Sequence, residues 1–102
     1  MRFENLDLNL LVVLDALLEE KSVSRASERL HLSQSGASAA LSRLREFFSD
    51  DLLTPSGRAM ALTPRGEALV EPVRAALEQI RTTILTPEVF DPAISERTVA
   101  IA

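Results

Sequence analysis

Apolar residues recur every three or four positions in three separate stretches of the first half of the chain. This spacing is typical of helices that bury one face. In the first stretch the apolar positions are Leu10, Leu11, Leu14, Leu17 and Leu18. A polar residue that can cap a helix N-terminus precedes each stretch, namely Asp7, Ser22 and Ser33. We therefore predict helices over about residues 8–20, 23–30 and 34–48.

The next part of the chain has a different pattern. Two short apolar runs, Leu52–Thr54 and Ala59–Leu62, flank the turn residues Pro55, Ser56 and Gly57, which predicts a small β-hairpin. Thr63-Pro64 is then a cap followed by Pro at the first helical position, so a long helix should run from Pro64 to about Leu85. The predicted fold is mainly α, with a three-helix core, a hairpin and a long final helix.

The second and third helices have unusually small side chains. Ten residues between Ser24 and Arg45 are Ser or Ala, and only a short turn, His31–Leu32 and the cap Ser33, separates the two helices. This is the spacing of a helix-turn-helix, in which the second helix enters the DNA major groove. The groove is about 12 Å wide and only just admits a helix. Gln34, at the start of that helix, can pair with an adenine edge.

The charge distribution agrees with a DNA partner. The chain has a formal net charge of −4, but residues 22–65 carry six arginines and four acidic residues. Arg58 lies at the tip of the predicted hairpin, where an arginine of a wing can enter the negative minor groove. An alternative remains open: the small-residue helix could instead pack on another protein helix, in a dimerisation or interaction module that does not bind DNA.

Other chemistry is poorly supported. The chain has no Cys and a single His, His31, so we predict neither a disulfide nor a metal site. Asp50 and Asp51 are adjacent acids that we expect to solvate a turn, and no companion group suggests catalysis, so we predict that the chain is not an enzyme. The sequence has neither a signal peptide nor an apolar run of about 20 residues, which favours a cytoplasmic location without a membrane partner.

The long helix carries apolar residues at coiled-coil spacing, which predicts a homodimer. The predicted dimerisation residues are Leu69, Val73, Ala76, Leu77, Ile80 and Ile84. Residues 88–96 resemble a linker in composition, and RTVAIA at 97–102 alternates like the first strand of a following domain. We therefore expect the chain to be part of a longer protein.

The segments LDLNLLVVLDALLEEKSVSRASERLHLSQSGASAALSRLREFF and DDLLTPSGRAMALTPRGEAL resemble the winged helix-turn-helix of LysR-type transcriptional regulators. The resemblance covers about residues 4–85 and is strongest to the branch that holds NodD-type regulators and activators of aromatic-compound catabolism. It implies a winged helix-turn-helix over 1–63, a linker and dimerisation helix over 64–86, and a hinge with the first strand of a truncated effector-binding domain over 87–102.

The resemblance also implies roles for single residues. The base-facing positions would be Gln34, Ser35, Ser38 and Ala39, with Arg58 in the minor groove. The positions near phosphates would be Ser33, Ser42, Arg43 and Thr63. The implied partners are double-stranded promoter DNA in the bacterial nucleoid, a second subunit through the long helix, a tetramer at full length, and RNA polymerase. A small-molecule effector, an aromatic compound in this branch, would bind the missing domain of an activator.

Overall fold

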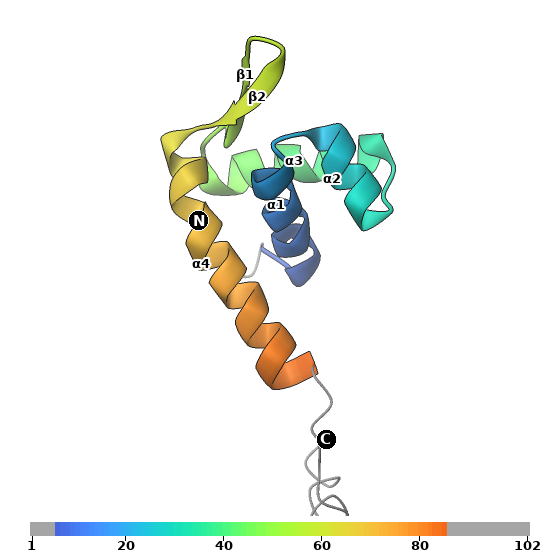
Figure 1. Ribbon diagram of the computed structural model, residues 1–102, viewed down its shortest axis with the longest axis vertical. Coiled ribbons are helices and arrows are strands. Elements are labelled where there is room, and N and C mark those ends of the chain that lie inside the picture. The colour runs from blue at the N-terminus through green and yellow to red at the C-terminus, as the bar shows by residue number, and fades with distance from the viewer. Residues whose placement is uncertain (1–5, 86–102) are drawn as a thin grey trace, which may run out of the picture.

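The computed structural model describes residues 6–85, which form four α-helices, a two-stranded hairpin and a terminal π-helical turn (Figure 1). In chain order the elements are α1 (Leu8–Glu20), α2 (Val23–Leu30), α3 (Gln34–Phe48), β1 (Leu53–Ser56), β2 (Ala59–Leu62), α4 (Pro64–Ile80) and η2 (Arg81–Leu85). The predicted fold class is confirmed. The hinge and strand predicted for 87–102 lie outside the described residues.

Side-chain caps determine where the four helices begin, as the sequence predicts. In each case the cap oxygen accepts a hydrogen bond from the backbone N–H three residues later, at 2.8–3.1 Å. The four caps are Asp7, Ser22, Ser33 and Thr63. Each cap satisfies one of the donors that a helix N-terminus leaves without an intrahelical partner.

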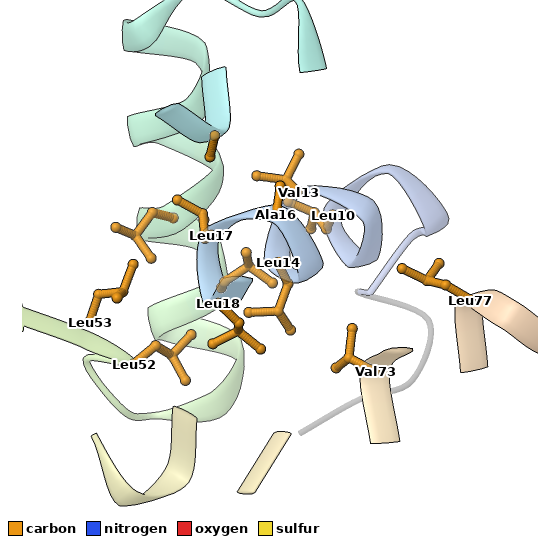
Figure 2. Close-up of a cluster of buried hydrophobic side chains, with 13 residues drawn as sticks. Leu10, Val13, Leu14, Ala16, Leu17, Leu18, Leu52, Leu53, Val73 and Leu77 are labelled. Atoms are coloured by element: carbon orange, nitrogen blue, oxygen red, sulfur yellow. The ribbon is translucent and has the colours of Figure 1, made fainter. Parts of the chain in front are cut away.

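Helix α1 forms the centre of the hydrophobic core (Figure 2). It packs against α2, α3 and α4. The largest fully buried side chains are Leu14, Leu17, Leu44, Leu52 and Leu53. The buried face predicted for the first helix is confirmed, with Leu11 only partly buried. Burial of leucine side chains of this kind contributes about 1.5–3 kcal/mol each, so this cluster accounts for much of the domain's stability.

The hairpin turn lies further along the chain than predicted. Ser56 pairs with Ala59, so Gly57 and Arg58 alone form the turn, whereas Pro55 and Ser56 belong to β1. Gly57 has a φ of 64°, a backbone conformation that glycine adopts without steric cost and that two-residue hairpin turns require. Pro55 is tolerated in the strand because the two-stranded sheet leaves its outer edge unpaired.

The C-terminal part of the long helix departs from the predicted α-helix. After Ile80 the chain continues as the π-helical turn η2. The hydroxyls of Thr82 and Thr83 donate to the backbone carbonyls of Glu78 and Gln79, four residues earlier. Such back-bonding competes with the α-helical hydrogen-bond pattern, which explains the change at this point.

Two of the predicted dimerisation residues belong to the core of the chain itself. Val73 and Leu77 are 5% and 7% exposed and form part of the core cluster that includes the buried leucines of α1. Their assignment to a subunit interface is therefore wrong. A coiled-coil seam and an intramolecular core face have the same apolar period, so the sequence does not separate them.

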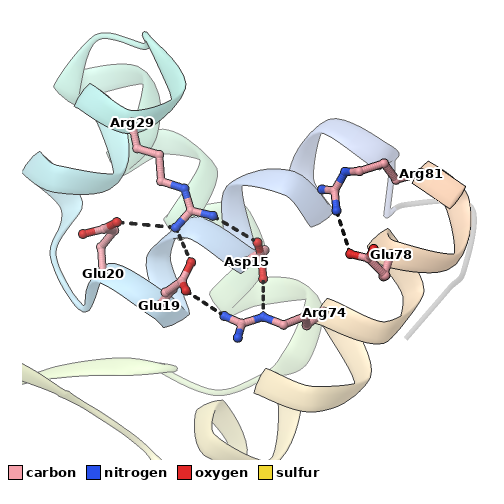
Figure 3. Close-up of polar contacts among 7 residues, drawn as sticks. All are labelled: Asp15, Glu19, Glu20, Arg29, Arg74, Glu78 and Arg81. Atoms are coloured by element: carbon pink, nitrogen blue, oxygen red, sulfur yellow. Dashed lines mark hydrogen bonds and ion pairs between the residues drawn. The ribbon is translucent and has the colours of Figure 1, made fainter. Parts of the chain in front are cut away.

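A network of ion pairs joins three helices on one side of the core (Figure 3). Arg29 of α2 contacts Asp15, Glu19 and Glu20 at the C-terminal half of α1. Arg74 of α4 reaches the same region, with 3.1 Å between its Nη2 and Oε2 of Glu19. The hydrogen bond and the charge of Arg29 lower the pKa of the Glu19 carboxyl. The network connects both α2 and α4 to α1.

Candidate nucleic-acid interface

The connection between α2 and α3 has the geometry of a helix-turn-helix. His31 ends α2 with a left-handed backbone at φ 58°, and its N–H donates to the carbonyl of Glu28 at 3.2 Å. The N–H of Leu32 donates to the carbonyl of Ser27 at 2.8 Å, and Ser33 then caps α3. The chain therefore changes direction within three residues, and this short turn fixes α3 relative to α2.

Helix α3 has one face in the core and one face in solvent. Ala37, Leu41 and Leu44 are 0%, 4% and 0% exposed. The positions predicted to face bases are all exposed: Gln34, Ser35, Ser38 and Ala39. Ser42 and Arg43, predicted to approach phosphates, are exposed as well. The edge of the helix that would enter a DNA groove is thus free, while the opposite face anchors it.

An open groove of about 570 Å³ brings separate elements of the site together. Gln34 at the start of α3 and Arg58 in the hairpin turn both line this groove, together with Lys21 and Arg25 near the start of α2. The sequence did not lead us to assign Lys21 or Arg25 to the site. Their positions on either side of the cap Ser22 could have indicated a phosphate contact. The net negative charge of the first 21 residues obscured this signal.

The six arginines of the positive middle segment fall into two groups. Arg29 binds the acids of α1, Arg45 donates to two backbone carbonyls, and Arg65 lies 5.4 Å from the centre of the Phe48 ring. In contrast, the side chains of Arg25 and Arg43 are exposed and make no hydrogen bond or ion pair within residues 6–85, and the same holds for the side chain of Arg58. Within residues 6–85, only the side chains of the second group could bind a partner without giving up an existing contact.

The two predicted phosphate contacts at helix caps differ. The Ser33 hydroxyl accepts from the N–H of Gly36 and lies 3.3 Å from the Ser35 hydroxyl, on the exposed surface. Thr63 is committed internally: its hydroxyl donates to Asp50 at 2.6 Å and its N–H donates to the carbonyl of Leu52 at 2.9 Å. Both donors of Thr63 therefore already have internal acceptors, and its contact with a phosphate stays a prediction.

Asp50 has a structural role that the sequence did not reveal. Its Oδ2 accepts from the hydroxyl of Thr63 and from the N–H of Leu52, and these bonds, with the charge of Arg65, lower the pKa of the Asp50 carboxyl. Asp51 is exposed, in agreement with the expectation of a solvated turn. Asp50 and Thr63 are thirteen positions apart, so only the folded chain brings them together.

Two classes of site receive no support in the described part of the chain. Residues 6–85 contain no group of three or more His, Asp or Glu side chains arranged to hold a metal ion. None of the helices in this range combines the length and apolar character needed to span a bilayer.

A helix-turn-helix with a free recognition edge, followed by a hairpin that carries a free arginine, defines a winged helix-turn-helix domain. Residues 8–67 match the family described as bacterial regulatory helix-turn-helix proteins, lysR family. The chain belongs to the LysR family. This is a family of regulatory proteins, which agrees with the expectation that the chain is not an enzyme.

Similar proteins include nodulation regulators and solved LysR-type structures. The chain is 54% identical over 97 residues to nodulation protein D 1 of Mesorhizobium japonicum, which is 95% of this chain and 31% of that protein. It is 40% identical to PA0477 of Pseudomonas aeruginosa, whose structure is described as that of a probable transcriptional regulator, with a TM-score of 0.75 over 84% of this chain and 30% of that one. It is 28% identical to full-length CbnR in complex with its target DNA, with a TM-score of 0.68 over 76% of this chain and 27% of that one. The chain thus spans about a third of the length of these relatives.

Proposed function

We propose that this domain binds double-stranded DNA in a sequence-specific manner, with α3 in the major groove and the hairpin in the adjacent minor groove. The observation that carries the proposal is the exposed edge of α3, where Gln34, Ser38 and Ser42 face solvent while Leu41 and Leu44 hold the helix in the core. Small side chains on that edge let the helix backbone approach the base edges.

The free cations support the same docking mode. A DNA strand that separates a major-groove contact by Gln34 from a minor-groove contact by Arg58 would run through the groove that both residues line. Lys21 and Arg25 line that groove too and are suited to its phosphates. Arg43, further along α3, would contact the phosphate backbone of the DNA. Because the chain carries a net charge of −4, binding would depend on these local cations rather than on overall charge.

Two residues of α3 shape the expected sequence preference. A side chain at Gly36 would place its Cβ 3.0 Å from the Ser33 hydroxyl, so a larger residue would require that capping hydroxyl to shift slightly. Ala39 is exposed but has no side-chain donor, so it can offer a base only apolar contact. Discrimination would therefore rest on Gln34, on Arg58 and on the shape of the DNA.

The proposal places this domain in a larger regulator. The relatives are about three times as long, and we expect a small-molecule effector, an aromatic compound by analogy, to bind outside residues 6–85. We propose that the full-length protein activates transcription and contacts RNA polymerase. We also propose that it is located in the cytoplasm. The 54% identity to nodulation protein D 1 supports the proposal that this chain is part of a larger regulator.

Dimerisation through α4 is a further part of the proposal, with a smaller set of residues than the sequence indicated. Ala76 and Ile84 are exposed, Ile84 by 71%, and Ile80 and Leu69 are partly exposed. Leu69 packs partly against the core cluster, whereas Ala76, Ile80 and Ile84 are not part of it. An antiparallel pairing of two α4 helices would cover them.

Replacement of Ile84 by Asp tests the dimer. A buried carboxylate without a partner is unfavourable in an apolar interface, so Ile84→Asp should shift the sedimentation mass from dimer to monomer. Ala75→Asp is a matched control, because Ala75 is exposed on the same helix and is not one of the predicted dimerisation residues. An unchanged mass for Ile84→Asp would rule out this interface.

A salt titration on selected DNA tests the main function. Sites are first selected from random duplexes with the 102-residue chain, and affinity is then measured from low to physiological salt. On a plot of log affinity against log salt concentration, each phosphate that the protein neutralises should contribute a slope of about −0.9. Failure to bind any duplex at low salt would favour the alternative, a helical dimerisation or protein-interaction module.

A further inference from the structure

Asp50 and Arg45 make polar contacts at the base of the β1–β2 hairpin, which we call the wing, and neither residue is among the proposed DNA contacts. Taking the proposed function as its basis, we propose that Asp50 and Arg45 are positioning residues for the wing. They fix the direction of the hairpin relative to α3, so that Arg58 reaches the minor groove when Gln34 is in the major groove.

Asp50 closes the base of the hairpin with a single carboxylate oxygen. Its Oδ2 accepts from the N–H of Leu52 at 2.8 Å and from the hydroxyl of Thr63 at 2.6 Å. Leu52 directly precedes β1, and Thr63 directly follows β2. The N–H of Thr63 also donates to the carbonyl of Leu52 at 2.9 Å. Both strands are therefore joined at the point where the hairpin leaves the helical body.

Arg45 connects the same base to α3. Its Nε donates to the carbonyl of Asp51 at 2.8 Å, and its Nη2 donates to the carbonyl of Leu53 at 2.8 Å. Arg45 follows Leu44, which is fully buried, so its position on α3 is fixed by the core. The planar guanidinium group can hold two acceptors in a defined direction. Movement of the strand entry relative to α3 would break one or both of these bonds.

The backbone at Leu52, whose N–H donates to Asp50, is in a conformation that leucine rarely adopts. Leu52 has a φ of 66°, in the left-handed region, and its side chain is fully buried. A Cβ at Gly66 would lie 2.6 Å from the Leu52 carbonyl oxygen, so the start of α4 also packs tightly on this residue. Leu52 adopts this shape because its N–H, its carbonyl and its side chain are all held by neighbouring groups.

Apart from Leu53, Met60 and Leu62, which pack against the core, the hairpin is held to the helical body by these polar contacts at its base. Figure 1 shows β1 and β2 projecting from the end of α3, away from the other helices, with Gly57 and Arg58 in the turn. The direction of such a projection is determined at its base. A small rotation there would displace Arg58 most, because the turn is the part of the hairpin furthest from the body.

A double-mutant cycle with Arg58 tests the proposal. Affinity for a selected duplex is measured with the 102-residue chain and with Asp50→Ala, Arg58→Ala and the double variant. Each single variant should lose affinity about tenfold, and Arg58→Ala should cost almost nothing further once Asp50 is replaced. Coupling of this kind indicates that Asp50 acts through the wing, whereas independent, multiplying losses would overturn the proposal.

Two further variants separate positioning from charge and from folding. Asp51→Ala removes the same charge from the neighbouring exposed residue and should leave affinity within about twofold, since a repulsive charge near DNA has only a small, screened effect. Asp50→Asn should restore most of the affinity, because an amide oxygen can accept the same two hydrogen bonds. Equal effects of Asp50→Ala and Asp51→Ala would overturn the proposal.

The outcomes for the two proposals are distinct. If Asp50→Ala lacks the helical circular dichroism of the parent, Arg45→Met takes its place in the cycle, because it removes the two hydrogen bonds from α3. If the parent chain binds no duplex, the proposed function and this inference both fail. If the parent binds but Arg58→Ala has no effect, or its loss multiplies with that of Asp50→Ala, only the inference fails.

Discussion

The buried and exposed faces of α3 both carry arginine and alanine, but these residues have different roles on the two faces. Arg43 and Arg45 are two positions apart, yet Arg43 is exposed without a partner within residues 6–85, while Arg45 donates to two backbone carbonyls. Ala37 is fully buried, and Ala39 is exposed. The comparison shows that helical phase, rather than residue type, decides whether a side chain of α3 supports the fold or remains exposed to solvent.

The largest expected effect is on the inner face. Leu44 is fully buried, so Leu44→Ala should lower the free energy of unfolding by about 2–5 kcal/mol through lost burial and a residual cavity. Urea denaturation measures this change. Ser42→Ala, on the exposed face two positions away, is the control and should change stability by less than about 0.5 kcal/mol. Similar losses for both variants would contradict the assignment of the faces.

The arginine pair gives a smaller but more direct test. Arg45→Met removes the donor to the part-buried carbonyl of Leu53, while the carbonyl of Asp51 keeps the hydrogen bond from the N–H of Leu53, and the variant should lose about 1–3 kcal/mol of stability. Arg43→Met should leave stability unchanged but reduce the salt slope of DNA binding by about one. Denaturation and salt titration of both variants check the contrast. A stability loss for Arg43→Met would show that it has a structural role.

Gln34 tests the outer face by specificity rather than by stability. Gln34→Ala should lose about 1–3 kcal/mol of discrimination between the selected site and a site with the contacted base pair changed, since glutamine can pair with an adenine edge. Binding to the two duplexes is compared at one salt concentration. A uniform loss on both duplexes would show that Gln34 contacts only the DNA backbone.

The smallest expected effect concerns pH. The pKa of Asp50 is lowered by hydrogen bonds from Thr63 and from the N–H of Leu52, and the pKa of Glu19 is lowered mainly by Arg29. A carboxyl with a lowered folded-state pKa stabilises the fold above its ordinary value near 4, and this contribution is lost as the pH falls through the lowered pKa. The melting temperature should therefore decrease below about pH 4.

Asp50→Asn should weaken this dependence of the melting temperature on pH, because the amide does not titrate. Asp51→Asn is the matched control, since no hydrogen bond to the Asp51 side chain is present within residues 6–85. The same pH profile for the parent and for Asp50→Asn would contradict the role given to the Asp50 carboxylate.

The features that the sequence predicts well are local ones. The caps Asp7, Ser22, Ser33 and Thr63 can be recognised because a cap and the N–H from which it accepts lie three residues apart. The buried and exposed faces of α3 can be recognised because its apolar residues recur with the helical period. The exposed recognition edge follows from these two signals, so the amino-acid pattern alone is enough to outline the candidate site.

The features that the sequence misses depend on contacts between distant segments. The turn is misplaced because Pro55 and Ser56 are common turn residues, whereas strand pairing leaves only Gly57 and Arg58 for the turn. The contact between Asp50 and Thr63 joins residues thirteen positions apart, and no local pattern marks it. The same limit applies to Val73 and Leu77, which the periodicity fits to either an interface or a core.

The division of α4 at Leu77 has a geometric consequence. Up to Leu77 the helix is fixed to α1, and beyond it the helix leads away from the three-helix body (Figure 1). One residue inserted after Leu77 would turn everything attached to the far end by about 100° and advance it by about 1.5 Å, while the core contacts stay in place. The number of residues between Leu77 and the end of the helix therefore sets the rotation of the three-helix body relative to any partner held at the other end.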